Sequence, residues 1–484
     1  MAHIGLDLGT FHTVASLFDP AQRRIIPFES VPSVALRGTH PPIVGREVQQ
    51  ARGALMLAPK LRLRDKGEDR RFLQSVLKRL AEQAIGPLYM PDGRMALTVP
   101  PGWTVDECDV VAQSVEDYGQ PVTFIHEPAA LLIAAAHLAE HYENASPLLT
   151  LLRMPGHVIV CDWGAGTVDL SIVSTKWDGS YEFRCKAENT LRGHGGVDVA
   201  REVVDLLFEA PSPDPRPEDR LGLDFKLQTG WEDGLRAGDI LRHNAEVAGV
   251  EQLERRVAEV RRRHVSAVAQ EIATVWQSAG LPQDANPVVL LHGGPLEATE
   301  LRNALLGDLA RSGVRPDRVY SLGSEYCGGL RPGAKPWRRD TLVSVGASLF
   351  AALGEALPEY GYEISLPDAG GNCADAVRLL RGAALAGRVA VEPKHTGLDY
   401  LAKVQQIRYD WDARTSQPTP IQKELGLYVR DEALVVYEIA EVGAGYACVE
   451  AYEAARTMTP RRLADAKSDS VKMPEKSTRF RIDV

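Results

Sequence analysis

Two stretches far apart in the chain share one pattern: an apolar run ends in Asp-x-Gly, small residues follow, and an alternating strand returns. The first is HIGLDLGTFHTVASLF at residues 3–18, and the second is VIVCDWGAGTVDLSIV at residues 158–173. Each copy is predicted to form a β-hairpin whose turn carries little side chain. Because the copies are about 155 positions apart, the repeat predicts two related lobes with a cleft between them.

These turns have a chemistry of their own. Glycine-rich turns let backbone N–H groups approach an anion closely. A carboxylate beside such a turn repels phosphate, but it can hold a divalent cation, usually through waters, and the cation then neutralises the phosphate charge. Two facing hairpins would therefore clamp a nucleotide triphosphate beside Asp7 and Asp162. Either hairpin alone is equally compatible with an ordinary tight turn.

Three further segments fit the same picture. PVVLLHGGPLEATELRNALLGDL, at 287–309, predicts a buried strand, a glycine pair and a helix, and bare backbone at such a pair lets a flat group lie against it. The alternative is an ordinary strand-to-helix connection. Two helices rich in small apolar residues are predicted after Glu127-Pro128 and at 340–357. If they cross where the lobes join, they would form a hinge.

Composition excludes several functional classes. The 484 residues allow two to four domains, and 44% hydrophobic with 25% charged residues is ordinary globular composition. A net charge of −10 argues against nucleic acid as a partner. The six cysteines form no CxxC pair, so neither a zinc site nor a disulfide framework is expected. The chain opens directly as a strand and has no long apolar run, so we expect a cytoplasmic protein with no membrane partner.

Taken in order, these motifs resemble the actin-like ATPase superfamily, most closely the nucleotide-binding domain of the seventy-kilodalton heat-shock protein (DnaK) chaperones. The resemblance covers about residues 3–355. It implies an α/β, two-lobed actin-like domain at 1–357 with duplicated ribonuclease-H-like lobes. Lobe I would span about 1–155, lobe II about 156–340, and a closing helix 340–357. A small β-rich C-terminal module of unknown role would occupy 358–484.

The resemblance also implies a site and an activity. The chain would bind ATP or ADP with Mg²⁺ and hydrolyse ATP slowly. Asp7 and Asp162 would hold the metal. The catalytic set would be Lys60, Glu127, Asp162, Thr167 and Asp169. The nucleotide contacts would be Gly9, Thr10, Phe11, Gly164, Ala165, Gly166, Gly195, Gly196, Gly293, Gly294 and Asp340.

Some positions depart from the family pattern. Phe11, Trp163 and Pro295 replace the commoner residues of their motifs. Lys60 is assigned from GREVQQARGALMLAPKLRLRD, and the alternative is a lysine on a basic face. The adenine-flanking helix should lie in 232–249, where Arg242 and His243 are the nearest candidates.

The C-terminal part lacks the family's linker, and its alternating stretches at 388–392, 403–412, 425–442 and 479–484 predict strands. The polar segment 459–477 is predicted to be a loose loop. In the family, ATP holds the lobes closed and ADP lets them relax. By resemblance, the C-terminal module would bind a protein client or partner, with co-chaperones or an exchange factor.

Three other functions compete with this reading. An actin-like filament former and a small-molecule kinase share the fold, and the substitutions at Phe11, Trp163 and Pro295 motivate an ATP binder without turnover. The arginines within 246–278 alternate with glutamates, so this helix is interpreted as a solvated face and not as a nucleic-acid patch.

Overall fold

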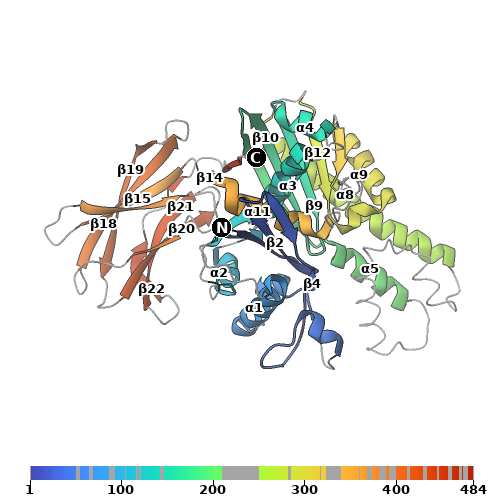
Figure 1. Cartoon of the computed structure of the whole chain (residues 1–484), viewed down its shortest axis with the longest axis horizontal. Coiled ribbons are helices and arrows are strands. Elements are labelled where there is room, and N and C mark those ends of the chain that lie inside the picture. Colours follow the sequence, from blue (N-terminus) through green and yellow to red (C-terminus); the bar gives the residue numbers. More distant parts are fainter. Residues whose placement is uncertain are drawn as a thin grey trace. The chain divides into compact units, whose positions relative to one another are not determined.

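The computed structural model divides the chain into two compact units, Met1–Gly354 with Ile482–Val484, and Glu355–Arg481. Figure 1 shows both units. The structure describes residues 2–50, 55–64, 69–86, 93–103, 105–115, 118, 122–141, 146–209, 250–281, 285–316, 318–322, 339–358, 360–367, 373–380, 388–391, 399–410, 415–428, 433–443, 446–455, 461–467, 471–472 and 478–482.

The first unit contains a mixed sheet near the N-terminus. Its order is β3 (Arg24–Pro27), β2 (His12–Asp19), β1 (His3–Leu8), β7 (Met95–Val99) and β8 (Val122–His126), with β4 (Val31–Pro32) beside β2. β1 is antiparallel to β2 and parallel to β7. The central strands β1 and β7 are almost entirely buried, which explains why most of their residues are apolar.

Helices cover this sheet. α1 (Arg70–Ile85) contacts β1 and β2, and α11 (Leu342–Leu353) contacts β1, β2 and β7. The Asp69 side chain caps α1 by accepting a hydrogen bond from the Arg71 N–H at 2.9 Å. The remaining elements here are short: β5 (Val34–Leu36), η1 (Gly45–Gln50), β6 (Leu55–Leu57), η2 (Pro59–Arg64) and α2 (Val105–Gln113).

A second mixed sheet follows in the same unit. It contains, in order, β13 (Arg318–Ser321), β12 (Val288–His292), β9 (Gly156–Trp163), β10 (Thr167–Trp177) and β11 (Tyr181–Arg192). β12 runs parallel to β9, and β10 runs antiparallel to both β9 and β11. α4 (Ser146–Arg153) contacts β10, and α5 (Gly196–Glu209) contacts α8 (Val250–Ser278). The chain is thus an α/β protein with two mixed sheets packed with helices, consistent with two lobes.

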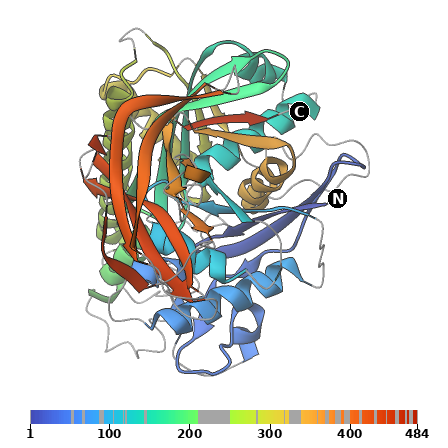
Figure 2. The same ribbon diagram turned by 90° about the vertical axis from the view of Figure 1, so that its left-hand side faces the viewer.

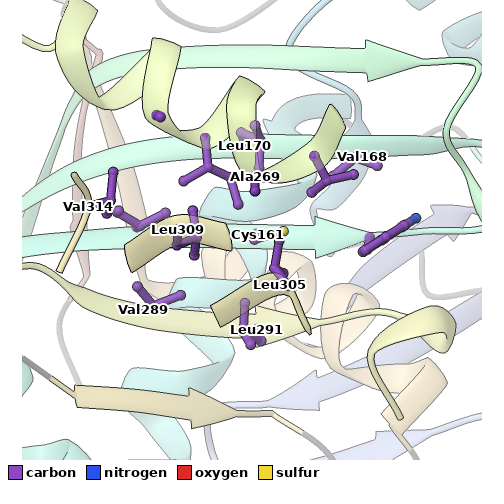
Figure 3. Packing of buried hydrophobic residues seen from close by; sticks show 14 of the residues in the cluster. Cys161, Val168, Leu170, Ala269, Val289, Leu291, Leu305, Leu309 and Val314 are labelled. Carbon is purple, nitrogen blue, oxygen red and sulfur yellow. The ribbon is translucent and has the colours of Figure 1, made fainter. Parts of the chain in front are cut away.

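The core of the second sheet is apolar on the face covered by α8 (Val250–Ser278) and α9 (Thr299–Arg311). Ala269 of α8 and Leu305 and Leu309 of α9 lie over the strand residues Cys161 and Leu291 (Figure 3). This dry packing fixes the strands, and it therefore fixes the ends from which the candidate site residues project.

Two helices of small residues cross in contact, as their composition predicts. A Cβ atom at Gly346 of α11 would lie 1.8 Å from the carbonyl oxygen of Ala130 in α3 (Glu127–His141). α3 also contacts β9 and β10, so this helix pair links both sheets. A hinge motion at the crossing stays a prediction. α11 ends at Leu353, earlier than the predicted end at 357, because Gly354 is extended and the strand β14 (Gly354–Pro358) begins there.

The second unit is built of strands. One sheet has the order β16 (Cys373–Leu380), β15 (Tyr360–Pro367), β18 (Asp399–Asp410) and β19 (Thr415–Tyr428). The other has the order β17 (Arg388–Val391), β20 (Ala433–Gly443), β21 (Tyr446–Ala455) and β22 (Arg461–Lys467). These strands are the orange to red ribbons of Figure 2. The prediction of a loose loop at 459–477 is wrong in part, because β22 and β23 (Val471–Lys472) both pair with β21. The chain then reaches β24 (Thr478–Ile482).

Candidate functional site

Both predicted hairpins form, and their turns meet. In the first, Asp7 lies opposite Val14, and in the second, Asp162 lies opposite Asp169. A Cβ atom at Gly166, in the second turn, would lie 2.5 Å from the hydroxyl oxygen of Thr10, in the first. The glycine therefore permits a contact between two turns that are far apart in the sequence.

Four carboxylates gather beside these turns: those of Asp7, Glu127, Asp162 and Asp169. Asp7 accepts a hydrogen bond from the Thr98 hydroxyl at 2.7 Å. Burial raises the pKa of Asp7 to about 7, helped by the negative charges of Glu127 and Asp162 and opposed by Lys60. Such mutual effects require the groups to be neighbours, so the structure brings residues of both hairpins and of α3 into one electrostatic cluster.

Lys60 lies within this cluster. It belongs to η2, its side chain is 4% exposed, and its Nζ is 2.5 Å from Oε1 of Glu127. The ammonium group also lies 5.1 Å from the ring centroid of Trp103. Burial alone would lower the pKa of Lys60, but Glu127 and Asp7 outweigh burial and raise it. The lysine is therefore charged at neutral pH, and the alternative of an exposed basic face does not describe it.

Asp169 is held by two threonines. The hydroxyl of Thr167 donates to Oδ2 at 2.6 Å, and the hydroxyl of Thr190 donates to Oδ1 at 2.7 Å. Burial raises the pKa of Asp169 well above its usual range, and Glu127 raises it further, against the two hydrogen bonds. Since the Thr167 hydroxyl donates its hydrogen bond to Asp169, it is not directed to a ligand in this arrangement.

Asp162 has a partner that sequence reasoning missed. His292, the last residue of β12, lies beside Asp162 in the parallel pairing of β12 with β9. Its Nδ1 is 2.9 Å from Oδ1 of Asp162, and both side chains are 8% exposed. The sequence could have indicated this contact, because His292 immediately precedes Gly293. Neighbouring parallel strands bring their carboxyl ends to the same edge of a sheet.

A second glycine loop closes against the second turn. The N–H of Gly196 donates to the carbonyl of Gly164 at 3.0 Å, and the N–H of Val197 donates to that of Ala165 at 2.8 Å. A Cβ atom at Gly195 would lie 2.4 Å from the Ala165 oxygen. The first turn of α5 therefore starts directly beside the hairpin turn.

Trp163, which departs from the motif of the family that the chain resembles, makes contacts of its own beside the second turn. Its indole is buried, and the ring N–H donates to the carbonyl of His194 at 2.8 Å. Gly293 has φ 114°, and a Cβ atom there would lie 1.9 Å from the Trp163 oxygen. The tryptophan thus joins the second turn to two other glycine segments.

Other predicted residues are placed less centrally. The carbonyl of Phe11 accepts a hydrogen bond from the Ser33 N–H at 2.8 Å. Gly294 begins η5 (Gly294–Glu297), and Asp340 lies in η6 (Arg339–Thr341) before α11. Their roles as nucleotide contacts stay predictions. Segment 232–249, with the adenine candidates Arg242 and His243, lies outside the described residues.

Within the described ranges, no group of three or more His, Cys, Asp or Glu side chains is arranged to hold a metal ion. Asp7 and Asp162 were predicted to hold a cation usually through waters, and such a site needs fewer protein ligands. No helix among the described residues is long and apolar enough to cross a membrane.

Comparison with known proteins adds no relative. None of the models of known protein families matches this chain. None of the curated proteins matches it either. The family therefore remains a resemblance carried by the motifs, and the site is defined by its geometry alone.

Proposed function

We propose that the chain is a DnaK-like, actin-like ATPase that binds ATP with Mg²⁺ at the carboxylate cluster and hydrolyses it slowly. The observation that carries the proposal is the meeting of the two hairpin turns beside Asp7, Asp162, Asp169 and Glu127, with Lys60 among them. Neither hairpin would need the other, or any carboxylate, for an ordinary tight turn.

The residues present fit a magnesium nucleotide. Carboxylate oxygens are the ligands that Mg²⁺ accepts, and it usually keeps several waters. The raised pKa values of Asp7 and Asp169 reflect negative charge crowded in a buried region, which a cation would relieve. Gly164, Gly166 and Gly195 lie in or beside the second turn and carry no side chain that would cover their backbone N–H groups. Asp7 and Asp162 would hold the metal, and these glycines would face phosphate.

The chemistry asked of the chain is positioning and charge control. Bound Mg²⁺ would neutralise charge on the phosphate oxygens. Lys60 would place its ammonium near the terminal phosphate, in exchange for part of its pairing with Glu127. Glu127 and Asp169 would accept hydrogen bonds from a water and orient it. Turnover is expected to be slow, as the resemblance implies.

Slow turnover suits a conformational switch. The crossing of α3 with α11 connects both sheets, so a change at the nucleotide can alter the contact between the sheets. We propose that ATP holds the two lobes closed. This closure would control the binding of a protein client or partner through the C-terminal unit. The role proposed for that unit is taken from the chaperones that residues 3–355 resemble, because the resemblance itself ends there.

The experiment compares wild type with Asp162→Asn and with Asp178→Asn, an exposed aspartate in the turn of the β10–β11 hairpin. Wild type should bind ATP by calorimetry in the presence of Mg²⁺ and release phosphate without any added acceptor. Asp162→Asn should lower the rate about 100-fold or more, whereas Asp178→Asn should leave it unchanged. A near wild-type rate in Asp162→Asn would refute the assignment.

The same samples separate the competing functions. Phosphate release that requires a sugar or acid acceptor would favour a small-molecule kinase. Nucleotide-dependent light scattering would favour a filament former. Tight ATP binding without turnover would favour a degenerate binder.

A further inference from the structure

One face of β11 carries a row of polar residues. They contact β8 of the first sheet and the turn that follows β7. Glu188, Thr190 and Arg192 alternate along the strand, so their side chains lie on one face. Thr190 accepts a hydrogen bond from the Gly102 N–H at 2.9 Å, and Arg192 donates to the Gly102 carbonyl at 3.4 Å. We call these three residues the β11 row. Because Thr190 also donates to Asp169, the row reaches the candidate site.

The strongest contact of the row is made by Glu188. Nδ1 of His126 lies 3.0 Å from one carboxylate oxygen of Glu188 and 3.1 Å from the other. The hydroxyl of Ser171 donates to the same carboxylate at 2.9 Å. Burial would raise the pKa of Glu188, but the charge of His126 and these hydrogen bonds lower it. The pair is also well shielded, with 20% and 14% of the two side chains exposed.

The position of His126 in the chain gives this pair its importance. His126 is the last residue of β8, and Glu127 is the first residue of α3. In the antiparallel pairing of β10 with β11, Ser171 lies opposite Glu188, and Asp169 lies opposite Thr190. His126 is therefore anchored to the Ser171–Glu188 pair, and the next residue, Glu127, is near enough to Asp169 of the neighbouring pair to raise its pKa.

We propose that His126 is a positioning residue for the ATPase proposed above. Its contact with Glu188 fixes the start of α3 and so holds the Glu127 carboxylate between Lys60 and Asp169. The inference rests on the proposed function for its catalytic consequence, but the anchoring of α3 can be measured without nucleotide. His126 itself contacts no reacting group.

The test uses the full chain with three changes at the pair. His126→Ala removes the donor, Glu188→Gln keeps the shape but removes the charge, and His126→Asn places an amide N–H close to the position of Nδ1. His141→Ala is the control, because His141 ends the same helix and is exposed. Thermal unfolding is followed for every variant, and Glu188→Gln keeps the test open if His126→Ala does not fold.

Two readouts decide the outcome. Hydrogen exchange of the amides at 127 and 129–131, measured without nucleotide, should be faster in His126→Ala and Glu188→Gln and close to wild type in His126→Asn. The kcat for ATP should fall about 10- to 100-fold in His126→Ala, with KM changed less than about threefold and partial recovery in His126→Asn. A loss of packing alone would lower thermal stability without this split and without rescue by asparagine.

The failures are distinguishable. If wild type hydrolyses no ATP, the proposed function is refuted, and the exchange at 127 and 129–131 still decides whether His126 anchors α3. If wild type is active and His126→Ala changes neither the exchange nor kcat, the positioning role is refuted. Equal effects in His141→Ala would also refute it.

Discussion

The raised pKa of Asp7 makes a prediction about stability that needs no ligand. Its folded-state pKa is about 7, against an ordinary value of 3.8. Between these two values the folded chain binds a proton that the unfolded chain releases, so the free energy of unfolding falls as pH rises. The penalty is absent below about pH 4, grows up to about pH 7 and is constant above.

The size of this penalty follows from the shift. About three pKa units correspond to about 4 kcal/mol, since one unit is worth about 1.4 kcal/mol. This is an upper limit, because Asp7 is only partly buried and solvent screens its charge. We expect about 2 kcal/mol. In Asp7→Asn the amide accepts the same hydrogen bond from Thr98 but carries no charge, so the penalty should vanish.

The assay is thermal unfolding of wild type and Asp7→Asn from pH 4 to pH 8 in the absence of divalent cations. The transition temperature of the variant should match wild type near pH 4 and exceed it by roughly 3 °C at pH 8. Asp178→Asn, with an exposed carboxylate, should show no such divergence. A difference between Asp7→Asn and wild type that does not depend on pH would refute the reasoning, and so would a less stable variant at pH 8.

Three further outcomes follow. Lys60→Met should cost about 3 kcal/mol or more in stability, because it leaves Glu127 buried without its 2.5 Å partner; wild-type stability would contradict the ion pair. Gly346→Ala should cost about 1–3 kcal/mol, because its Cβ would lie 1.8 Å from the Ala130 oxygen, while Gly156→Ala, whose nearest atom is 3.9 Å away, should be neutral by chemical denaturation. Magnesium chloride should raise the transition temperature more at pH 8 than at pH 5, where protons compete for the carboxylates, and sodium chloride of equal ionic strength should not.

The sequence predicted the parts of the site that are local. Each hairpin is a short-range feature, because the turn residues and the flanking alternation are adjacent in the chain. Gly9, for example, is required where a Cβ would lie 2.3 Å from the His12 oxygen. The small-residue helices were also readable, since close crossing demands residues such as Gly346.

What the sequence did not give was pairing between distant strands. His292 reaches Asp162 only because β12 and β9 are neighbours in parallel register. Thr190 reaches Asp169, and Glu188 reaches His126, only because of the register of β11 with β10 and the approach of β8. One residue of slip would turn these side chains to the other face. The strands at 461–467 and 471–472 were also missed. Their sequences are polar, and they are strands because they pair with β21.

The cluster also argues against a purely structural role. Burying several carboxylates together costs free energy, and a lysine returns only part of it. The pKa of Asp7 near 7 and the raised pKa of Asp169 show that this cost is not fully offset within the chain. A neutral or apolar set would hold the two turns together more stably, since replacing buried ion pairs by packed apolar residues is often neutral or stabilising. Strain of this kind is concentrated at functional sites, and the Mg²⁺ and ATP proposed above would relieve it.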